Sequence, residues 1–294
     1  MTICSITSGL GNQLFQYSAG LHWVKVHGGE LTLDTSWYNC QKHQPKRAFR
    51  LGAFHIPESK VGGAVSLGLM GARFLAKKMP NLLESVLYKA FWTDIVTETD
   101  VHNPDPRFED GRRDDRAIWL NGYWQTADHF LAVREILSEN LKPAIELSSG
   151  YRHWLQEITR SASVFIHVRR GDYVDIGHGM LTPAYYAAAV EQFPHGSRWF
   201  IFSEDLKWCR ARLNFPGAVS FVDYVSPNRD IEDLLLMAAC GGAIIANSSF
   251  SWWGAALGES DDRLVVAPNF RHGPGEGDVQ MHRLLPRWKT INTF

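Results

Sequence analysis

The second half of this chain alternates apolar runs with segments of helical spacing, and no other feature constrains its fold as much. Apolar runs typical of buried strands recur between residues 164 and 267, each separated from the next by a stretch with helical spacing. The expected strands are 164–168, 198–202, 218–222, 243–246 and 263–267, and the expected helices are 183–193, 206–213, 230–240 and one beginning at Gly254. Repeated strand–helix units form a parallel sheet covered by helices on both faces. The predicted fold class is therefore α/β.

The first half opens with the same kind of unit. Residues 2–6 have the pattern of a strand, a turn with Gly9 and Gly11 follows, and helical spacing continues to Trp23. Further on, we expect a strand at 117–120, helices at 127–140 and 150–159, and an irregular tail after the last strand. A chain of 294 residues has room for two domains. We predict two Rossmann-like domains, residues 1–155 and residues 156–294.

Composition limits the partners of this chain. With 30 basic and 31 acidic residues, the chain has no net field that would attract nucleic acid. The four cysteines lie far apart and fit ordinary intracellular thiols, and the N-terminus has no signal-peptide pattern. The most apolar run, residues 61–76, is too short to cross a bilayer, so we expect no transmembrane segment. A core helix or a peripheral contact with a membrane surface remains open for this run.

Polar residues follow the expected strand at 164–168 directly. His167 lies within it, and Arg169 and Arg170 come immediately after it. The carboxyl ends of parallel strands are where α/β folds bind their ligands. Because two adjacent guanidinium groups repel each other, and because their geometry matches phosphate oxygens, this pair favours a phosphate or diphosphate ligand. The structural alternative is a surface strand end with two solvated arginines.

A second polar cluster, Asn247–Gly254, follows the apolar run 243–246. Small hydroxyl side chains at a strand-to-helix turn offer Oγ donors together with free backbone N–H groups, which is the equipment of an anion site at a helix N-terminus. The turn carries three hydroxyl side chains and an amide, those of Ser248, Ser249, Ser251 and Asn247. Helix capping explains one of the serines, since serine is a common N-cap residue.

Carboxylates are expected at the same edge of the sheet. Acidic residues stand at the start of the expected helix 230–240, where they usually complement the helix dipole; they are Asp230, Glu232 and Asp233. A carboxylate there can also accept two hydrogen bonds from guanine N1–H and N2–H₂. Asp205 is interpreted as a supporting or capping residue. Because the chain contains no Asp-x-Asp triplet, we expect arginine and hydroxyl groups to meet the phosphate charge without a metal.

Four motifs together resemble those of the bacterial α1,2-fucosyltransferases of glycosyltransferase family 11. They are Gly9–Tyr17, Gly122–Gln125, His167–Asp172 and Asn247–Gly254, which occur in the expected order. The resemblance implies a GT-B fold with two facing Rossmann-like domains, residues 1–155 on the acceptor side and residues 156–294 binding GDP-fucose. It implies inverting, metal-independent transfer of L-fucose from GDP-fucose to the 2-hydroxyl of a terminal β-galactoside. GDP-fucose and a galactose-terminated glycan are the implied partners, and no cofactor is expected.

The resemblance also implies roles for individual residues. Arg169, with Arg170 beside it, would grip the diphosphate, and His167 would lie beside the donor. The turn at Ser248, Ser249 and Phe250 would hold the diphosphate, and Asp233 matches by spacing the aspartate that recognises guanine in the related α1,6-fucosyltransferases. In the first glycine turn, Gly11 and Asn12 would approach the donor sugar.

The general base stays open between Asp175 and His178, which follow the arginines on one loop. Asp172 is interpreted as an internal partner of the arginine pair beside the phosphates. Two other functions are considered: a fucosyltransferase of another linkage, such as α1,6, and a non-catalytic carbohydrate-binding protein. Family context implies a cytoplasmic enzyme that adds sugars to O-antigen glycans. Whether this enzyme contacts the inner membrane stays open.

Overall fold

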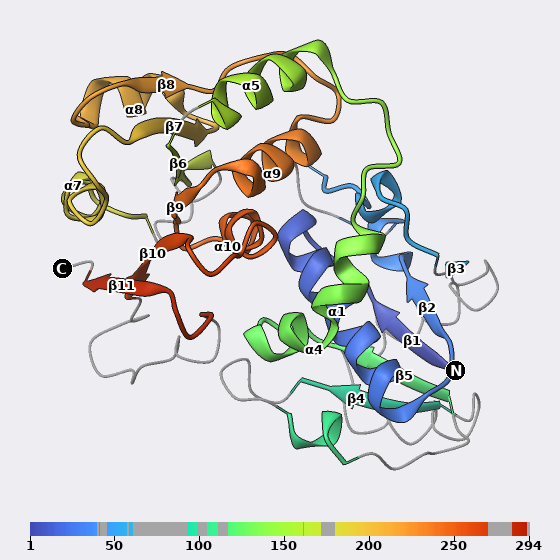
Figure 1. The fold of residues 1–294 in the computed structure, drawn as a ribbon. Coiled ribbons are helices and arrows are strands. Elements are labelled where there is room, and N and C mark those ends of the chain that lie inside the picture. The colour runs from blue at the N-terminus through green and yellow to red at the C-terminus, as the bar shows by residue number, and fades with distance from the viewer. Residues whose placement is uncertain are drawn as a thin grey trace. The chain divides into compact units, whose positions relative to one another are not determined.

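The computed structural model divides the chain into two compact units, Met1–Ala144 and Ile145–Phe294 (Figure 1). It describes residues 1–39, 41, 46–57, 59–60, 93–98, 105–110, 117–160, 162–171, 180–269 and 284–292. Each unit has a parallel β-sheet with helices, as the alternating sequence pattern predicts. None of the helices described has the length and apolar character needed to cross a bilayer. The apolar run 61–76 lies outside the described residues.

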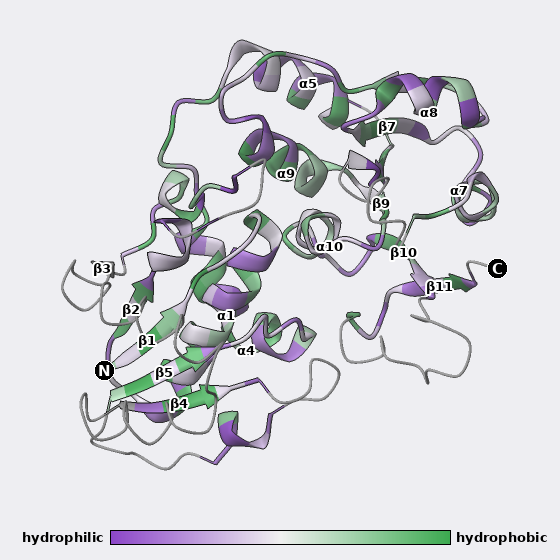
Figure 2. Ribbon diagram, turned by 180° about the vertical axis from the view of Figure 1, so that it is seen from behind, coloured by the Kyte–Doolittle hydropathy of each residue, from purple (hydrophilic) through white to green (hydrophobic). Residues whose placement is uncertain are grey.

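The first unit contains a five-stranded parallel sheet in the order β3-β2-β1-β5-β4. Its strands are β1 Thr2–Ser5, β2 Leu31–Asp34, β3 Ser59–Lys60, β4 Thr93–Thr97 and β5 Ala117–Asn121; its helices are α1 Leu10–His27 and α4 Ala127–Asn140, with 3₁₀ turns η1 Ser36–Asn39, η2 Leu51–Ala53 and η3 Pro106–Phe108. Helix α1 packs closely on the sheet because Gly20 has no side chain there. A Cβ at this position would lie 2.8 Å from Leu31 Cδ1. Figure 2 colours β5 largely as hydrophobic.

The second unit contains a six-stranded parallel sheet in the order β11-β10-β9-β6-β7-β8. Its strands are β6 Ser163–Val168, β7 Arg198–Ser203, β8 Val219–Phe221, β9 Gly242–Ile244, β10 Leu264–Asn269 and β11 Lys289–Asn292; its helices are α5 Ser149–Thr159, α7 Pro183–Val190, α8 Leu206–Arg212, α9 Arg229–Ala239 and α10 Ser249–Ala256. Counted from β6, this is the 3-2-1-4-5-6 order of doubly wound nucleotide-binding sheets. The order reverses between β6 and β9.

Strand β6 lies in the centre of this sheet, and all six of its residues are buried. One face of β6, with Val164, Ile166 and Val168, packs against Tyr185 and Tyr186 of α7. Helix α9 packs against both α5 and α10. Gly254 of α10 allows the close approach to α9, since a Cβ there would lie 2.9 Å from Met237 Cβ. A continuous apolar run without alternation is typical of such a strand, covered on both faces.

Three predicted boundaries differ from the structure. Helix α10 begins at Ser249, not at Gly254, because Ser251 accepts a hydrogen bond from the backbone N–H of Ala246 and draws the serine segment into the first turn. The irregular tail contains β11, an exposed edge strand without an apolar pattern. The division between the units follows Ala144 and precedes α5, whose N-cap Ser148 is bonded to Glu232 of α9, whereas the predicted boundary lies after residue 155.

Candidate active site

The two predicted phosphate-binding clusters meet at the point where the strand order of the second sheet reverses. Arg169 follows β6, and Ser248 follows β9 after a short connection; β6 and β9 are paired, with Ile166 opposite Ile244. Parallel α/β sheets bind ligands outside the carboxyl ends of their strands, at this kind of reversal. The sequence predicted the two clusters, and the strand order brings them together.

The two arginines have carboxylate partners from the end of β7. Arg169 forms an ion pair with Glu204, and Arg170 Nε lies 3.1 Å from Asp205 Oδ2. The Arg170 guanidinium also stacks 4.1 Å from the centre of the Trp208 ring. Asp205 accepts a hydrogen bond from the backbone N–H of Trp208 at the start of α8, so its predicted supporting and capping role is confirmed.

These contacts distinguish the two arginines. Arg170 is held between Asp205 and the Trp208 ring, which fixes its direction. Arg169 is paired with Glu204, whose side chain is 43% exposed. An exposed carboxylate has little to lose when a better anion replaces it, because water solvates it. Asp205, the partner of Arg170, is 39% exposed, so the two arginines differ in the contact with Trp208 and not in the solvation of their partners.

The serine-rich turn starts helix α10. Ser248 is the N-cap residue, yet its side chain makes no capping hydrogen bond, while its backbone carbonyl accepts from Trp252 N. Ser251 is structural, because its Oγ accepts from Ala246 N at 2.8 Å. The backbone N–H groups of the first helical turn, which include those of Ser249 and Phe250, have no partner within a helix. This arrangement leaves both a hydroxyl and N–H groups for an anion.

His167 connects the two clusters from inside the sheet. Its side chain is 4% exposed, and its ring centre lies 5.7 Å from that of Phe250 in α10. Burial, reinforced by the charge of Arg169, lowers the pKa of His167 to about 3. Its Nδ1 has no hydrogen-bond partner within the part of the chain that the structure describes. His167 is therefore a neutral imidazole packed against the aromatic ring of the serine turn.

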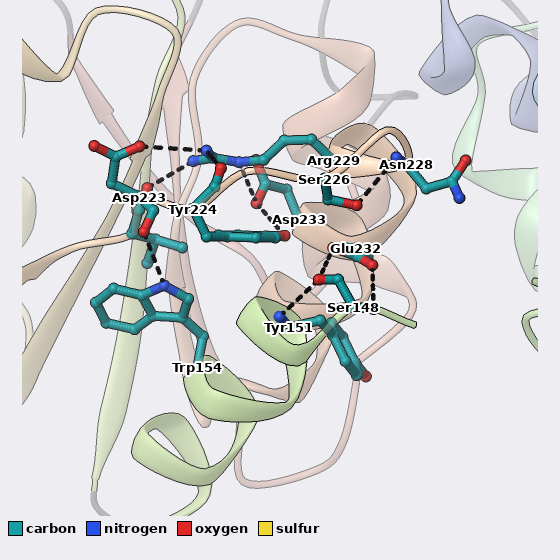
Figure 3. A network of polar contacts seen from close by, with 11 residues as sticks. Ser148, Tyr151, Trp154, Asp223, Tyr224, Ser226, Asn228, Arg229, Glu232 and Asp233 are labelled. Carbon is teal, nitrogen blue, oxygen red and sulfur yellow. Dashed lines mark hydrogen bonds and ion pairs between the residues drawn. The ribbon is translucent and has the colours of Figure 1, made fainter. Parts of the chain in front are cut away.

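Asp233 lies in a polar network between α9 and the segment after β8 (Figure 3). Its Oδ1 accepts a hydrogen bond from the Tyr224 hydroxyl at 2.9 Å, and its Oδ2 lies 3.2 Å from Arg229 Nε. The Arg229 guanidinium is stacked 4.4 Å from the centre of the Tyr224 ring. Burial raises the pKa of the Asp233 carboxyl to about 6, although Arg229 and Tyr224 act in the opposite direction.

Sequence reasoning missed Arg229 and Tyr224. The signal for Arg229 was its position four residues before Asp233, which places the two side chains on one face of a helix. Tyr224 had no local signal, because its contact with Asp233 depends on how the segment after β8 folds back on α9.

In the first unit, two of the four quoted motifs are hydrogen-bonded to each other. Gln125 Nε2 donates to Asn12 Oδ1 at 2.8 Å, and Gln16 Nε2 donates to the carbonyl of Gly122 at 3.0 Å. Asn12 lies in the first turn of α1, directly after buried Gly11. The motifs follow β1 and β5, which are neighbours in this sheet.

The loop after β1 and the loop after β5 each contain a residue with strained backbone angles. Ser8 and Trp124 have φ angles of 65° and 54°, values that side chains other than glycine rarely adopt. The loop after β5 is held by Glu98, which accepts hydrogen bonds from the backbone N–H groups of Tyr123 and Trp124. Strained backbone held by such contacts is common at functional sites. Glu98 was not predicted, since nothing local marks it.

The remaining candidates, Asp172, Asp175 and His178, lie outside the described residues. The choice of a general base and the predicted pairing of Asp172 with the arginines therefore stay predictions. The carboxylates that the structure places beside the arginines are Glu204 and Asp205.

Comparison with known proteins agrees with this architecture. A solved structure of the NodZ alpha-1,6-fucosyltransferase, soaked with GDP-fucose, superposes with a TM-score of 0.50 over 87% of this chain and 91% of that one, at 14% sequence identity. This likeness confirms the predicted α/β fold with two Rossmann-like units of the GT-B type.

Residues 90–292 match the family model of glycosyl transferase family 11, and the chain belongs to this family. It is 28% identical to an alpha-1,2-colitosyltransferase of Escherichia coli, over 91% of both chains. It is 30% identical to the O-antigen biosynthesis glycosyltransferase WbnK of Escherichia coli, over 90% of this chain and 92% of the relative. It is also 28% identical to the galactoside alpha-(1,2)-fucosyltransferase 1 of Bos taurus, over 53% of this chain and 46% of the relative.

Proposed function

We propose that this chain transfers L-fucose from GDP-fucose to the 2-hydroxyl of a terminal β-galactoside, with inversion and without a metal. The observation that carries the proposal is the meeting of Arg169 and the Ser248–Phe250 turn at the reversal of a Rossmann-type sheet. Family membership and the similarity to an α1,2-specific relative support the reaction class and the linkage. The proposed setting is the cytoplasm, with O-antigen-type glycans as acceptors, in keeping with the relative WbnK.

In this proposal the second unit binds the nucleotide. Arg169 and the hydroxyl and N–H groups of Ser248, Ser249 and Phe250 bind the diphosphate; Arg170 adds positive charge, and His167 supports the turn through Phe250. Asp233 recognises guanine through its carboxylate. In the first unit, Asn12 and Gly11 contact the donor sugar or the acceptor beside it.

The chemistry follows from charge development on the leaving group. In an inverting transfer the acceptor oxygen attacks opposite the departing GDP, through an oxocarbenium-like transition state. Negative charge grows on the diphosphate as the glycosidic bond breaks. Donors fixed in advance stabilise that charge more than they stabilise the bound substrate. Arg169 and the serine turn supply these donors, and Asp175 or His178 accepts the proton from the acceptor hydroxyl.

Colitosyl transfer is a second candidate, because the colitosyltransferase relative covers 91% of this chain. The two reactions share the α1,2 linkage and differ in the sugar transferred. The choice between fucosyl transfer and colitosyl transfer is therefore decided by the sugar donor that the purified chain turns over faster.

The test is to incubate the purified chain with lactose and GDP-fucose or GDP-colitose, with EDTA present, and to measure GDP release and product linkage by NMR. The proposal expects GDP release with GDP-fucose and a fucose on the galactose 2-hydroxyl. Faster turnover of GDP-colitose supports the second candidate, and a product of another linkage contradicts the α1,2 assignment. Binding of β-galactosides without any GDP release indicates a carbohydrate-binding protein, and activity lost in EDTA and restored by Mg²⁺ or Mn²⁺ contradicts metal independence.

A further inference from the structure

The contacts around Asp233 fix the orientation of its carboxylate more tightly than the stability of helix α9 requires. Arg229 donates to the carbonyls of Val222 and Tyr224, both in the segment after β8, and its Nε lies between the two oxygens of Asp233, at 3.3 and 3.2 Å. The Tyr224 ring in turn rests on the backbone of α5, since a Cβ at Gly150 would lie 2.7 Å from that ring. Arg229 therefore joins the segment 222–228, helix α9 and the Asp233 carboxylate into one rigid group (Figure 3).

This arrangement leaves acceptor capacity on Asp233. An ionised carboxylate has about four lone-pair sites. The Tyr224 hydroxyl and Arg229 Nε use part of them. The Asp233 side chain is 17% exposed, so the remaining sites are within reach of a ligand. Guanine offers two adjacent N–H donors, and only the ionised carboxylate accepts both, because a protonated one presents an O–H to one of them.

We propose that Arg229 and Tyr224 are positioning residues that orient Asp233 and keep it ionised, so that this triad sets how guanine-nucleotide affinity depends on pH. The inference rests on the proposed function, because it assumes that Asp233 recognises the guanine of the donor. It extends that function by assigning the two residues that act on the guanine-binding group without contacting guanine themselves.

Charged and titratable groups surround Asp233 on each element that packs near it. On its own helix, Arg229 favours the ionised form, and buried Glu232 opposes it. The segment after β8 contributes Tyr224, which donates to Asp233, and Asp223, which pairs with Arg229. Helix α5 contributes Tyr151, whose pKa is raised by burial and by Glu232. Helix α10 carries no titratable side chain. Arg229 is thus the cation that offsets the burial of Asp233.

The sign of the expected effect follows from these contacts. Burial raises the pKa of Asp233 to about 6, so wild-type affinity for GDP should fall as the pH drops through this value. Removing the Arg229 charge should raise the pKa of Asp233 by a further 1–3 units or so, the range typical of a neighbouring opposite charge. The variant then loses affinity at a higher pH than the wild type does.

The experiment measures GDP affinity by isothermal titration calorimetry from pH 5.5 to pH 8.5 for the wild type and for Arg229→Gln, Arg229→Lys and Tyr224→Phe. For Arg229→Gln, the wild-type to variant affinity ratio should be about fivefold larger at pH 6 than at pH 8.5, for a shift of about one unit. Arg229→Lys keeps the charge and should restore most of the wild-type profile. Tyr224→Phe should shift the profile in the same direction by less, because it removes only a hydrogen bond to the ionised form.

Glu232→Gln is the matched control, since it removes a neighbouring negative charge and should shift the profile toward lower pH. Titration of the GDP phosphates is common to all the proteins and cancels in the ratios. A network with only a structural role would lower affinity by the same factor at every pH, and parallel profiles would overturn the inference. Failure of the wild type to bind GDP at pH 8 would instead contradict the proposed function. If Arg229→Gln does not fold, the opposite shifts of Tyr224→Phe and Glu232→Gln still decide the question.

Discussion

Replacing Arg169 by alanine separates the role of this residue in binding from any role in folding. Arg169 is only 18% exposed, but its partner Glu204 is 43% exposed and remains solvated when the arginine is removed. An exposed ion pair contributes at most about 1 kcal/mol to stability. The Arg169→Ala protein should therefore fold, with a free energy of unfolding within about 1 kcal/mol of the wild type.

The effect on GDP affinity should be much larger. A hydrogen bond between a charged donor and a charged acceptor contributes about 1.5–3 kcal/mol. Since about 1.4 kcal/mol corresponds to a factor of ten, Arg169→Ala should weaken GDP binding by about 10- to 100-fold. Turnover should fall by more, because the charge on the diphosphate grows in the transition state. Calorimetry with GDP, initial rates with GDP-fucose and lactose, and urea denaturation measure the three quantities.

Arg198→Ala is the matched control. Arg198 is at the amino end of β7, on the opposite edge of the same sheet, and it pairs with Glu157 at 3.5 Å. Arg198→Ala should change GDP affinity and turnover by less than about twofold, since salt screens surface charges that lie far from a ligand. Near-normal turnover in Arg169→Ala, or equal losses in both variants, would refute the assignment of Arg169 to the diphosphate.

Three further predictions address the same unit. Glu204→Gln removes the carboxylate that pairs with the Arg169 guanidinium, so GDP should bind about two- to tenfold more tightly by calorimetry. Weaker binding would show that Glu204 helps to hold the ligand. Gly254→Ala places a Cβ 2.9 Å from Met237 Cβ and should lower the free energy of unfolding, measured in urea, by about 1–3 kcal/mol. Gly52→Ala, whose Cβ would have its nearest contact at 3.5 Å, is the control and should lower it by less than about 0.5 kcal/mol. The pKa of His167 is about 3 in the folded protein, below its value of 6.5 in the unfolded chain. The free energy of unfolding should therefore fall by about 1.4 kcal/mol per pH unit below pH 6, and His167→Gln should reduce that slope. An unchanged slope in the variant would contradict the burial of His167 as a neutral ring.

Local patterns predicted the central elements well. The apolar run 164–168 predicted β6, and the helical spacing of 127–140 matched α4, because both patterns depend on residues close in sequence. The short strands β3 and β4 were not predicted. Thr93–Thr97 contains Asp94 and has a weak apolar pattern, and it becomes a strand through its pairing with β5. Edge strands of this kind depend on a distant partner.

In the candidate site, too, features that depend on neighbouring residues could be predicted, and features that depend on distant residues could not. The sequence places Arg169 and Ser248 at strand ends, because each follows an apolar run. It does not contain the strand order that makes β6 and β9 neighbours, which arises from packing of the whole unit. It also could not distinguish a serine that caps a helix from one that leaves its hydroxyl free, since serine bonds to the backbone in both settings. The contacts of Glu204 and Tyr224 depend on side chains that meet across strands and helices.

The central claim is that the diphosphate of a guanine nucleotide lies at the reversal between β6 and β9. A crystal structure of the chain with GDP tests it most directly. The account predicts diphosphate oxygens within about 3.2 Å of the Arg169 guanidinium and of donors in the Ser248–Phe250 turn. A diphosphate bound elsewhere on the chain, with Arg169 still paired to Glu204, would contradict it.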